Sequence, residues 1–119
     1  NLAIRQFSDE IPALLKNADL AISRAGAGAI YELMVTKTPS ILIPFPNSTD
    51  QHQEFNAAYM AKFGGAVIVN QHDPEKKTLK NTISNLIYSN SLIQMKLNMN
   101  NHVCLDSENK IFDILKSII

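Results

Sequence analysis

The sequence predicts an α/β domain built on a parallel sheet with flanking helices, and three observations support this fold class. Short apolar runs alternate with longer helical segments, in the order strand, helix, strand, helix, strand, helix, strand, which favours parallel strands joined by right-handed crossovers. Residues 40–44 form a short apolar run that is typical of a strand buried on both faces. The length of 119 residues suits one compact domain, so we expect residues 1–119 to fold as a single unit.

Two strand–helix units open the chain. Residues 2–7 form a short apolar stretch that predicts a strand, and Ser8 then has the side chain of a helix N-cap. Pro12 lies early enough in the following helix to be tolerated there. Residues 18–23 predict the second strand, and residues 26–35 predict a helix that is opened by small residues.

The apolar run that predicts the third strand is followed by a polar loop at residues 46–49. A helix is then predicted over residues 50–63. The pair Gly64–Gly65 ends that helix, because glycine is the usual residue just beyond a helix C-terminus. Residues 66–70 predict the fourth strand.

Beyond residue 74 the pattern is helical only. Apolar residues recur at helical spacing and form three stripes, which predict helices packed against a core. The stripes consist of Leu79, Ile83, Leu86 and Ile87, of Leu92, Met95 and Met99, and of Ile111, Leu115 and Ile118.

The composition limits the classes of function. Apolar residues make up 45% of the chain, which is enough to build a core. The 11 basic and 11 acidic residues balance, so no overall field favours nucleic acid, and an anionic ligand must be held by local dipoles and hydrogen bonds. The single cysteine, Cys104, fits a reducing compartment, and no apolar run is long enough to cross a bilayer. The chain starts within a predicted strand, so we expect it to be a piece of a longer protein.

The loop after the second strand contains two glycines directly before a helix. Glycine lets backbone N–H groups approach a phosphate closely, and the helix N-terminus adds about half a positive charge. We therefore expect residues 26–29, which are Gly26, Ala27, Gly28 and Ala29, to form an anion-binding loop. The pattern by itself is also compatible with a tight turn that binds nothing, because Tyr31 stands where a dinucleotide-binding fingerprint has its third glycine.

Glu32 lies four residues after Gly28, one turn into the predicted helix. Helical side chains lean toward the N-terminus, so this carboxylate is expected to lie back over the loop. A carboxylate in that position suits two neighbouring hydroxyls, as on a ribose. The alternatives are a favourable early-helix acid and a surface ion pair with a nearby lysine.

Polar side chains cluster at the start of the third helix. His52, Gln53 and Asn56 are spaced three and four residues apart, which places them together on the first turns. Neutral groups that both donate and accept hydrogen bonds suit the hydroxyls of a sugar. Two structural alternatives remain, because Asp50 and Gln53 have the spacing of a capping box and a lone histidine such as His52 is more often structural.

No metal or cofactor is expected. His52, His72 and His102 lack acidic partners at the spacing of metal ligands. The sequence has neither a Walker loop nor a Gly-x-Ser-x-Gly nucleophile elbow. The candidate chemistry is therefore confined to the loops at the carboxyl ends of the strands, where open α/β sheets bind their ligands.

Three segments together resemble the carboxyl-terminal domain of the MurG family, the UDP-N-acetylglucosamine (UDP-GlcNAc) transferases of peptidoglycan synthesis. They are Arg-Ala-Gly-Ala-Gly-Ala-Ile-Tyr-Glu at 24–32, Pro-Ser-Ile-Leu-Ile-Pro-Phe-Pro at 39–46 and Asp-Gln-His-Gln-Glu-Phe-Asn-Ala at 50–57. The resemblance covers residues 4–70 well and the helical tail only in its general pattern. It implies a Rossmann-like domain that forms the carboxyl-terminal half of a GT-B glycosyltransferase.

The resemblance also implies a role for each loop. The small-residue loop is expected to receive the diphosphate of UDP-GlcNAc, and the acid one turn later to bind the ribose hydroxyls. The polar cluster of the third helix is expected to face the ribose and the GlcNAc hydroxyls, and backbone after the first strand to pair with the uracil edge. The implied nucleotide-sugar-binding residues are Phe7, Ser8, Gly26, Ala27, Gly28, Ala29, Glu32, His52, Gln53 and Asn56.

The implied reaction is the inverting transfer of GlcNAc from UDP-GlcNAc to the MurNAc C4 hydroxyl of lipid I, which forms lipid II. The chain lacks the glycine-rich unit that opens this domain in the family, and the whole first domain with its lipid-acceptor site and general base. We therefore expect this fragment to hold no catalytic residue and to be inactive alone. The family works at the inner face of the bacterial cytoplasmic membrane, to which only the intact protein would dock.

Two other functions remain open on the sequence. The UDP-GlcNAc transferase subunit of the dolichol-linked pathway resembles the same half-domain and works with a separate membrane partner. The alternative from another class is a non-catalytic α/β binding module whose glycine loop is only a tight turn.

Overall fold

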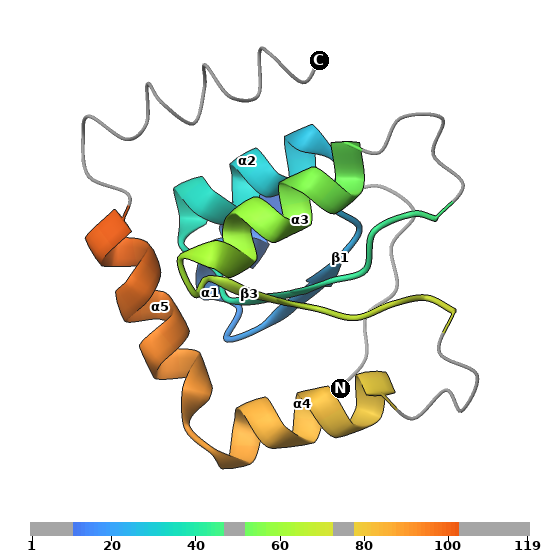
Figure 1. Ribbon diagram of the computed structural model, residues 1–119. Coiled ribbons are helices and arrows are strands. Elements are labelled where there is room, and N and C mark those ends of the chain that lie inside the picture. The colour runs from blue at the N-terminus through green and yellow to red at the C-terminus, as the bar shows by residue number, and fades with distance from the viewer. Residues whose placement is uncertain (1–10, 47–51, 73–77, 103–119) are drawn as a thin grey trace.

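A computed structural model describes residues 11–46, 52–72 and 78–102 of the chain. The strand predicted at residues 2–7 and the third helical stripe, at residues 111–118, lie outside the described residues. Within them, helices and strands alternate as predicted and two further helices follow (Figure 1). The elements are α1 (Ile11–Asn17), β1 (Ala21–Ser23), α2 (Ala27–Thr36), β2 (Ser40–Leu42), α3 (His52–Lys62), β3 (Ala66–Ile68), α4 (Thr78–Tyr88) and α5 (Ser91–His102).

The three described strands form one parallel sheet in the order β1-β2-β3. In this register Ser40, at the start of β2, lies opposite Ala21 of β1 and Ala66 of β3. The parallel arrangement confirms the predicted fold class. It also places the carboxyl ends of all three strands at one edge, and the loops that follow β1 and β2 therefore leave the sheet side by side.

Each strand is shorter than its apolar run suggests. The amide of Ala18 donates to the carbonyl of Leu15 at 3.2 Å, so the residues before β1 close the end of α1 rather than extend the sheet. Pro44 has no amide hydrogen and cannot continue the ladder beyond β2. The apolar patterns located the three described strands correctly, and neighbouring hydrogen bonds determined where these strands end.

Neighbouring residues of the central strand β2 face opposite sides of the sheet and belong to two separate cores. Leu42 packs with α2 and α3, whereas Ile41 packs with α4. The first core contains Ala25, Ile30, Leu33, Met34, Leu42, Ala57, Met60, Ala66 and Met99, and the second contains Ile41, Val69, Leu86 and Met95. Both faces of β2 are thus covered, as its continuous apolar run predicted.

Helix α5 contributes to both cores, with Met99 in the first and Met95 in the second. In Figure 1 it runs beside the sheet rather than over one face. The turn between α3 and β3 packs against it, since Asn98 donates from Nδ2 to the carbonyl of Gly64 at 3.2 Å. Gly64 has a φ of 84°, a left-handed conformation that confirms its predicted place just beyond α3. Among the described helices, none is long and apolar enough to span a bilayer.

Candidate nucleotide-sugar site

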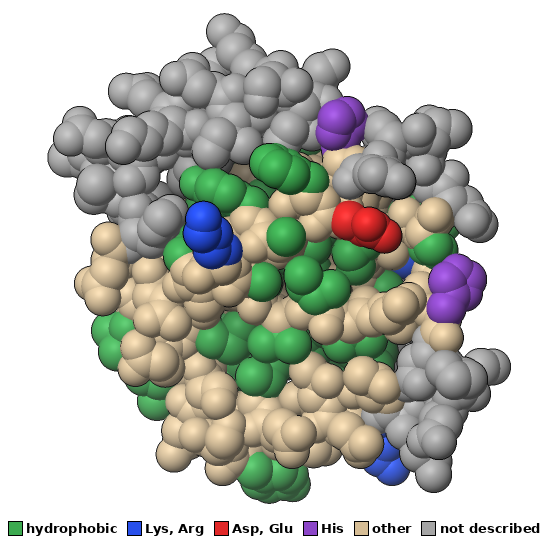
Figure 2. Space-filling view, in the orientation of Figure 1, with side chains coloured by type: hydrophobic (Ala, Val, Ile, Leu, Met, Phe, Trp, Pro, Cys, Tyr) green, Lys and Arg blue, Asp and Glu red, His purple; other side chains and the backbone are tan. Residues whose placement is uncertain are grey.

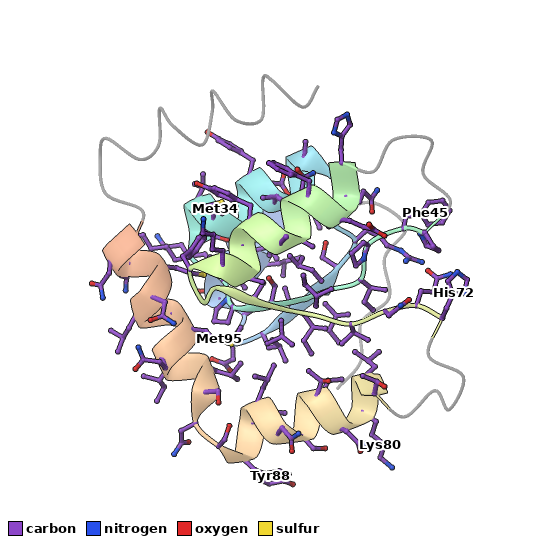
Figure 3. All side chains as sticks on the ribbon, in the orientation of Figure 1. Met34, Phe45, His72, Lys80, Tyr88 and Met95 are labelled. Carbon is purple, nitrogen blue, oxygen red and sulfur yellow. The ribbon has the colours of Figure 1, made fainter. Side chains whose placement is uncertain are left out.

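The candidate site lies at the edge of the sheet where the strands end. Figure 3 shows Phe45, which follows β2, and His72, which follows β3, at this same edge. The backbone ladder continues to this edge, because the amide of Ile43 donates to the carbonyl of Ser23 at 2.9 Å. The first residues of α2 and α3 therefore begin beside one another, each held by the sheet below it.

The start of α2 leaves its first amide groups free of side-chain caps. Gly26 is the N-cap residue, with φ −66° and ψ 155°, and no described side chain caps the helix. Its carbonyl accepts the first helical hydrogen bond from the amide of Ile30 at 3.0 Å. The first turn contains no acidic residue. A helix start of this kind presents unpaired N–H groups and partial positive charge to any anion in front of it.

The small residues of this loop leave open space in front of the helix. A Cβ atom placed on Gly26 or on Gly28 would meet no other atom within 4 Å. Neither glycine has a positive φ, since Gly64 is the only glycine with one among the described residues. Neither packing nor backbone conformation within the described part of the chain thus requires glycine here. A ligand that approaches the backbone closely would require it.

Glu32 lies one turn further along α2 and is half-buried. Among the described residues it forms no ion pair, which argues against the surface pair with lysine that the sequence left open. The next two residues of the helix, Leu33 and Met34, are buried in the first core. Their packing holds in place the turn of α2 that carries Glu32.

Asn56 ties α3 to the loop after β1. It is 2% exposed, and its Nδ2 donates to the carbonyl of Ala25 at 2.9 Å. Its Oδ1 is buried and accepts no hydrogen bond from a described residue. A buried amide oxygen without a donor is unusual in a folded protein and points to a missing partner.

The side chain of Gln53 binds the loop after β2. Its Oε1 accepts a hydrogen bond from the amide of Phe45 at 2.8 Å. The other half of the predicted capping box, Asp50, lies outside the described residues, as do the candidate uracil contacts Phe7 and Ser8. The described bond shows that the Gln53 carboxamide oxygen is already engaged.

A family model described as the glycosyltransferase family 28 C-terminal domain matches residues 1–113 of the chain. The chain belongs to this family. The resemblance to MurG is confirmed by relatives and by a solved structure. The fold class is confirmed with it, as the Rossmann-like carboxyl-terminal half of a GT-B glycosyltransferase.

Curated relatives of this family 28 domain carry one name, UDP-N-acetylglucosamine–N-acetylmuramyl-(pentapeptide) pyrophosphoryl-undecaprenol N-acetylglucosamine transferase. The protein of Prochlorococcus marinus strain NATL2A is 77% identical over 118 residues, which cover 99% of this chain. The protein of Synechococcus sp. strain CC9605 is 47% identical over 127 residues, again over 99% of this chain. The chain spans about a third of their length, 34% and 36% respectively.

The crystal structure of Acinetobacter baumannii MurG matches this family 28 domain with a TM-score of 0.73 and 26% sequence identity. The match covers 93% of this chain and 32% of that chain. Because so much of the chain superposes at this identity, the sheet and helices described above are those of a MurG carboxyl-terminal domain.

Sequence reasoning missed Arg24 as a contact between loops of the family 28 domain. Its Nη1 donates to the carbonyl of Ile43 at 3.3 Å, and its guanidinium carbon lies 5.2 Å from the centre of the Phe45 ring. In the sequence, Arg24 was only the first residue of the segment 24–32 that resembles the MurG family. The available signal was an arginine placed directly after a predicted strand, in a chain whose next βα loop contains an aromatic residue.

His52, in contrast, is exposed at the first residue of α3. No contact ties it to the other candidate residues in the described part of the chain, so the structure brings Asn56 and Gln53 to the loops but leaves His52 apart. No group of three His, Cys, Asp or Glu side chains within the described ranges could hold a metal ion.

Two cavities flank the sheet of the family 28 domain at opposite edges. The smaller, about 250 Å³, lies beside the candidate loops and is lined by Pro44, Pro46, Glu54, Ile68 and Asn70. The larger, about 420 Å³, lies at the other edge, around Ala18–Leu20 and Pro39, which precede β1 and β2. The smaller cavity lies beyond the carboxyl ends of the strands, where open parallel sheets bind ligands, and none of the candidate nucleotide-sugar-binding residues lines it.

The charge of the site is local. Figure 2 views the side of the molecule that α3 covers, where the described charged side chains are few and lie apart, with apolar side chains between them. The 11 basic and 11 acidic residues of the whole chain balance. We therefore expect an anion at the start of α2 to depend on helix amides and the helix dipole more than on a basic patch.

Proposed function

We propose that this chain is the donor-binding domain of a UDP-GlcNAc transferase and that residues 1–119 hold the nucleotide sugar for a partner domain. The intact protein would transfer GlcNAc from UDP-GlcNAc to the MurNAc C4 hydroxyl of lipid I, with inversion at the anomeric carbon, to form lipid II. The names of the relatives support this donor and this acceptor. The acceptor site and the general base belong to the remainder of such a protein.

One observation carries the proposal, the uncapped start of α2. Gly26 leaves the first-turn amides free, and the space in front of Gly26 and Gly28 is open. The diphosphate is placed there, held by backbone N–H groups rather than by a metal ion. Glu32, one turn deeper, then lies at the right depth to bind the two ribose hydroxyls.

The polar residues of α3 complete the site on its sugar side. Gln53 and Asn56 lie on the first turns of this helix, which begins beside α2, and each already holds a neighbouring loop in place. The unpartnered Oδ1 of Asn56 is the atom that a small rearrangement would offer to a donor group of the ligand. We assign Gln53 to the hydroxyls of the GlcNAc unit, and Asn56 to the ribose and GlcNAc hydroxyls. We assign His52, the exposed first residue of the same helix, to this side of the site as well.

These roles account for the contribution of the domain to catalysis. When the anomeric carbon is attacked, negative charge develops on the diphosphate of the departing UDP. The amides of α2 stabilise that charge without reorganisation, because they are fixed in the helix. The domain also orients the sugar for attack. It supplies leaving-group stabilisation and alignment, and neither step needs a catalytic residue of its own.

We also propose where in the cell the intact protein works. An acceptor built on pyrophosphoryl-undecaprenol, as the names of the relatives state, is a membrane lipid, and UDP-GlcNAc is a cytoplasmic metabolite. The enzyme would then work as a peripheral protein on the inner face of the bacterial plasma membrane. The docking surface belongs to the intact protein rather than to this domain.

Replacing Glu32 with glutamine tests the ribose contact. A carboxylate that accepts two hydroxyl hydrogen bonds contributes about 1.5–3 kcal/mol per charged bond, so Glu32→Gln should weaken UDP binding about ten- to hundredfold. Calorimetric titration of UDP and of UDP-GlcNAc should show the same loss for both ligands, because both contain the ribose.

The matched control is Asp19→Asn, which removes one negative charge from an exposed residue at the opposite edge of the sheet. It should leave both affinities unchanged. A wild-type chain whose amides between Gly26 and Glu32 do not shift in NMR spectra at millimolar UDP-GlcNAc would contradict the proposed function. Binding that Glu32→Gln leaves intact would contradict the role of Glu32 alone.

A further inference from the structure

Arg24 contacts the loop after β2 at two successive points. Its Nη1 donates to the carbonyl of Ile43 at 3.3 Å, and its guanidinium group lies over the ring of Phe45, 5.2 Å from the ring centre. The side chain is exposed and makes no contribution to either core. Its described contacts therefore fix the path of the loop rather than the stability of the fold.

The same loop holds the carboxamide of Gln53. The amide of Phe45 donates to Oε1 of Gln53 at 2.8 Å. Only the oxygen of a carboxamide can accept a bond from an N–H group, so this contact fixes which way the amide is turned. The NH₂ group of Gln53 is left to point elsewhere, and Gln53 can offer a ligand two N–H donors.

The circuit closes through the neighbouring turn of α3. Asn56 donates from Nδ2 to the carbonyl of Ala25, the residue after Arg24. Arg24 thus holds the loop of Phe45, Phe45 holds Gln53, and Asn56 holds the loop of Arg24. The partner of Asn56 must be an acceptor, which leaves its oxygen free of described donors. The two amides are therefore oriented in opposite senses, one with N–H groups available and the other with an oxygen.

We infer that Arg24 is a positioning residue for the donor sugar, which acts through Phe45 to orient the Gln53 carboxamide as a hydrogen-bond donor. The inference rests on the proposed function, because it names the residue that prepares the sugar side of the same site. Arg24 would affect how UDP-GlcNAc is held through its sugar. It would have no part in holding the UDP portion.

The first test compares two ligands in one variant. Arg24→Met removes the guanidinium group and retains an unbranched apolar side chain. It should weaken UDP-GlcNAc binding about three- to tenfold, the range of one hydrogen bond, while UDP binding stays unchanged. Lys80→Met is the control, since it removes one positive charge from an exposed residue of α4, which Figure 3 places away from Phe45. Equal losses for both ligands would show that Arg24 serves the diphosphate, and would overturn the inference.

The second test asks whether Arg24 works through Gln53. In a double-mutant cycle, Arg24→Met should have no further effect on UDP-GlcNAc binding when Gln53 is already alanine. Phe45→Leu, which removes the ring beneath the guanidinium group but keeps the backbone amide, should cause part of the Arg24→Met loss. Losses that add in full in the double variant would overturn the inference.

A third measurement needs no ligand and so separates this inference from the proposed function. In the free chain, the Phe45 amide should be protected from hydrogen exchange, and the Gln53 side-chain NH₂ should give an ordered NMR signal. Arg24→Met should raise the Phe45 exchange rate and mobilise that NH₂, whereas Lys80→Met should change neither. An ordered Gln53 in the Arg24→Met variant would overturn the inference even where UDP-GlcNAc binds as proposed.

Discussion

Gly28→Asp should make the free domain more stable and remove nearly all of its affinity for UDP. The Cβ of a residue at position 28 has open space, so aspartate fits without displacing a neighbour. A residue other than glycine in the first turn of α2, with negative charge near the helix N-terminus, should add about 0.5–1.5 kcal/mol to the free energy of unfolding. The same charge would face the diphosphate. At about 4 Å near a protein surface, two like charges repel by about 4 kcal/mol, which is about a thousandfold in affinity.

The substitution is expected to raise the free energy of unfolding and to lower the affinity for UDP. This combination is the test, because a mutation that damages the fold cannot raise stability and lower affinity together. Urea unfolding measures the first effect and calorimetric titration of UDP the second. Gly28→Asn is the matched control, since asparagine has the size of aspartate without its charge. It should lose affinity through its size alone, and so much less than Gly28→Asp. If Gly28→Asp bound UDP as the wild-type chain does, the diphosphate would lie elsewhere.

Asn56→Asp should strongly destabilise the domain at neutral pH and far less in acid. Asn56 is 2% exposed, and its Nδ2 donates to the Ala25 carbonyl at 2.9 Å. A carboxylate there would place one of its oxygens against the carbonyl oxygen of Ala25 in a buried site. Burial and this repulsion would raise the pKa of the new side chain, so it would remain protonated in the folded state and donate to Ala25 instead.

The pH dependence follows from linkage. In the unfolded chain the aspartate would titrate near its ordinary pKa of about 3.9, and each pH unit above that value costs the folded state about 1.4 kcal/mol while the buried group stays protonated. The loss should be small below pH 4, grow as the pH rises, and approach about 4 kcal/mol at pH 7. Urea unfolding from pH 4 to pH 7 measures it. Asn100→Asp, at an exposed position of α5, makes the same chemical change and should show no such slope.

The sequence by itself predicted the elements whose signals are local. Gly26 and the small residues after it indicated the start of α2, and the Gly64–Gly65 pair indicated the end of α3; the structure places both within a residue or two. The apolar run before Pro44 indicated a strand buried on both faces. These features depend on backbone preferences and on the spacing of apolar residues within a short stretch of chain, and both can be determined from the sequence alone. The conjunction of three segments was specific enough to indicate the family as well.

The tertiary structure alone decided how the candidate side chains are held. The bonds from Phe45 to Gln53, from Arg24 to Ile43 and from Asn56 to Ala25 join residues 8, 19 and 31 positions apart. The spacing of Gln53 did not indicate that its oxygen accepts a hydrogen bond from the loop after β2. The only signal for Arg24 was its place directly after a predicted strand, which does not indicate its partners. A side chain can form a hydrogen bond only with a group that the packing of the sheet brings within about 3 Å. No local pattern along the chain determines that distance.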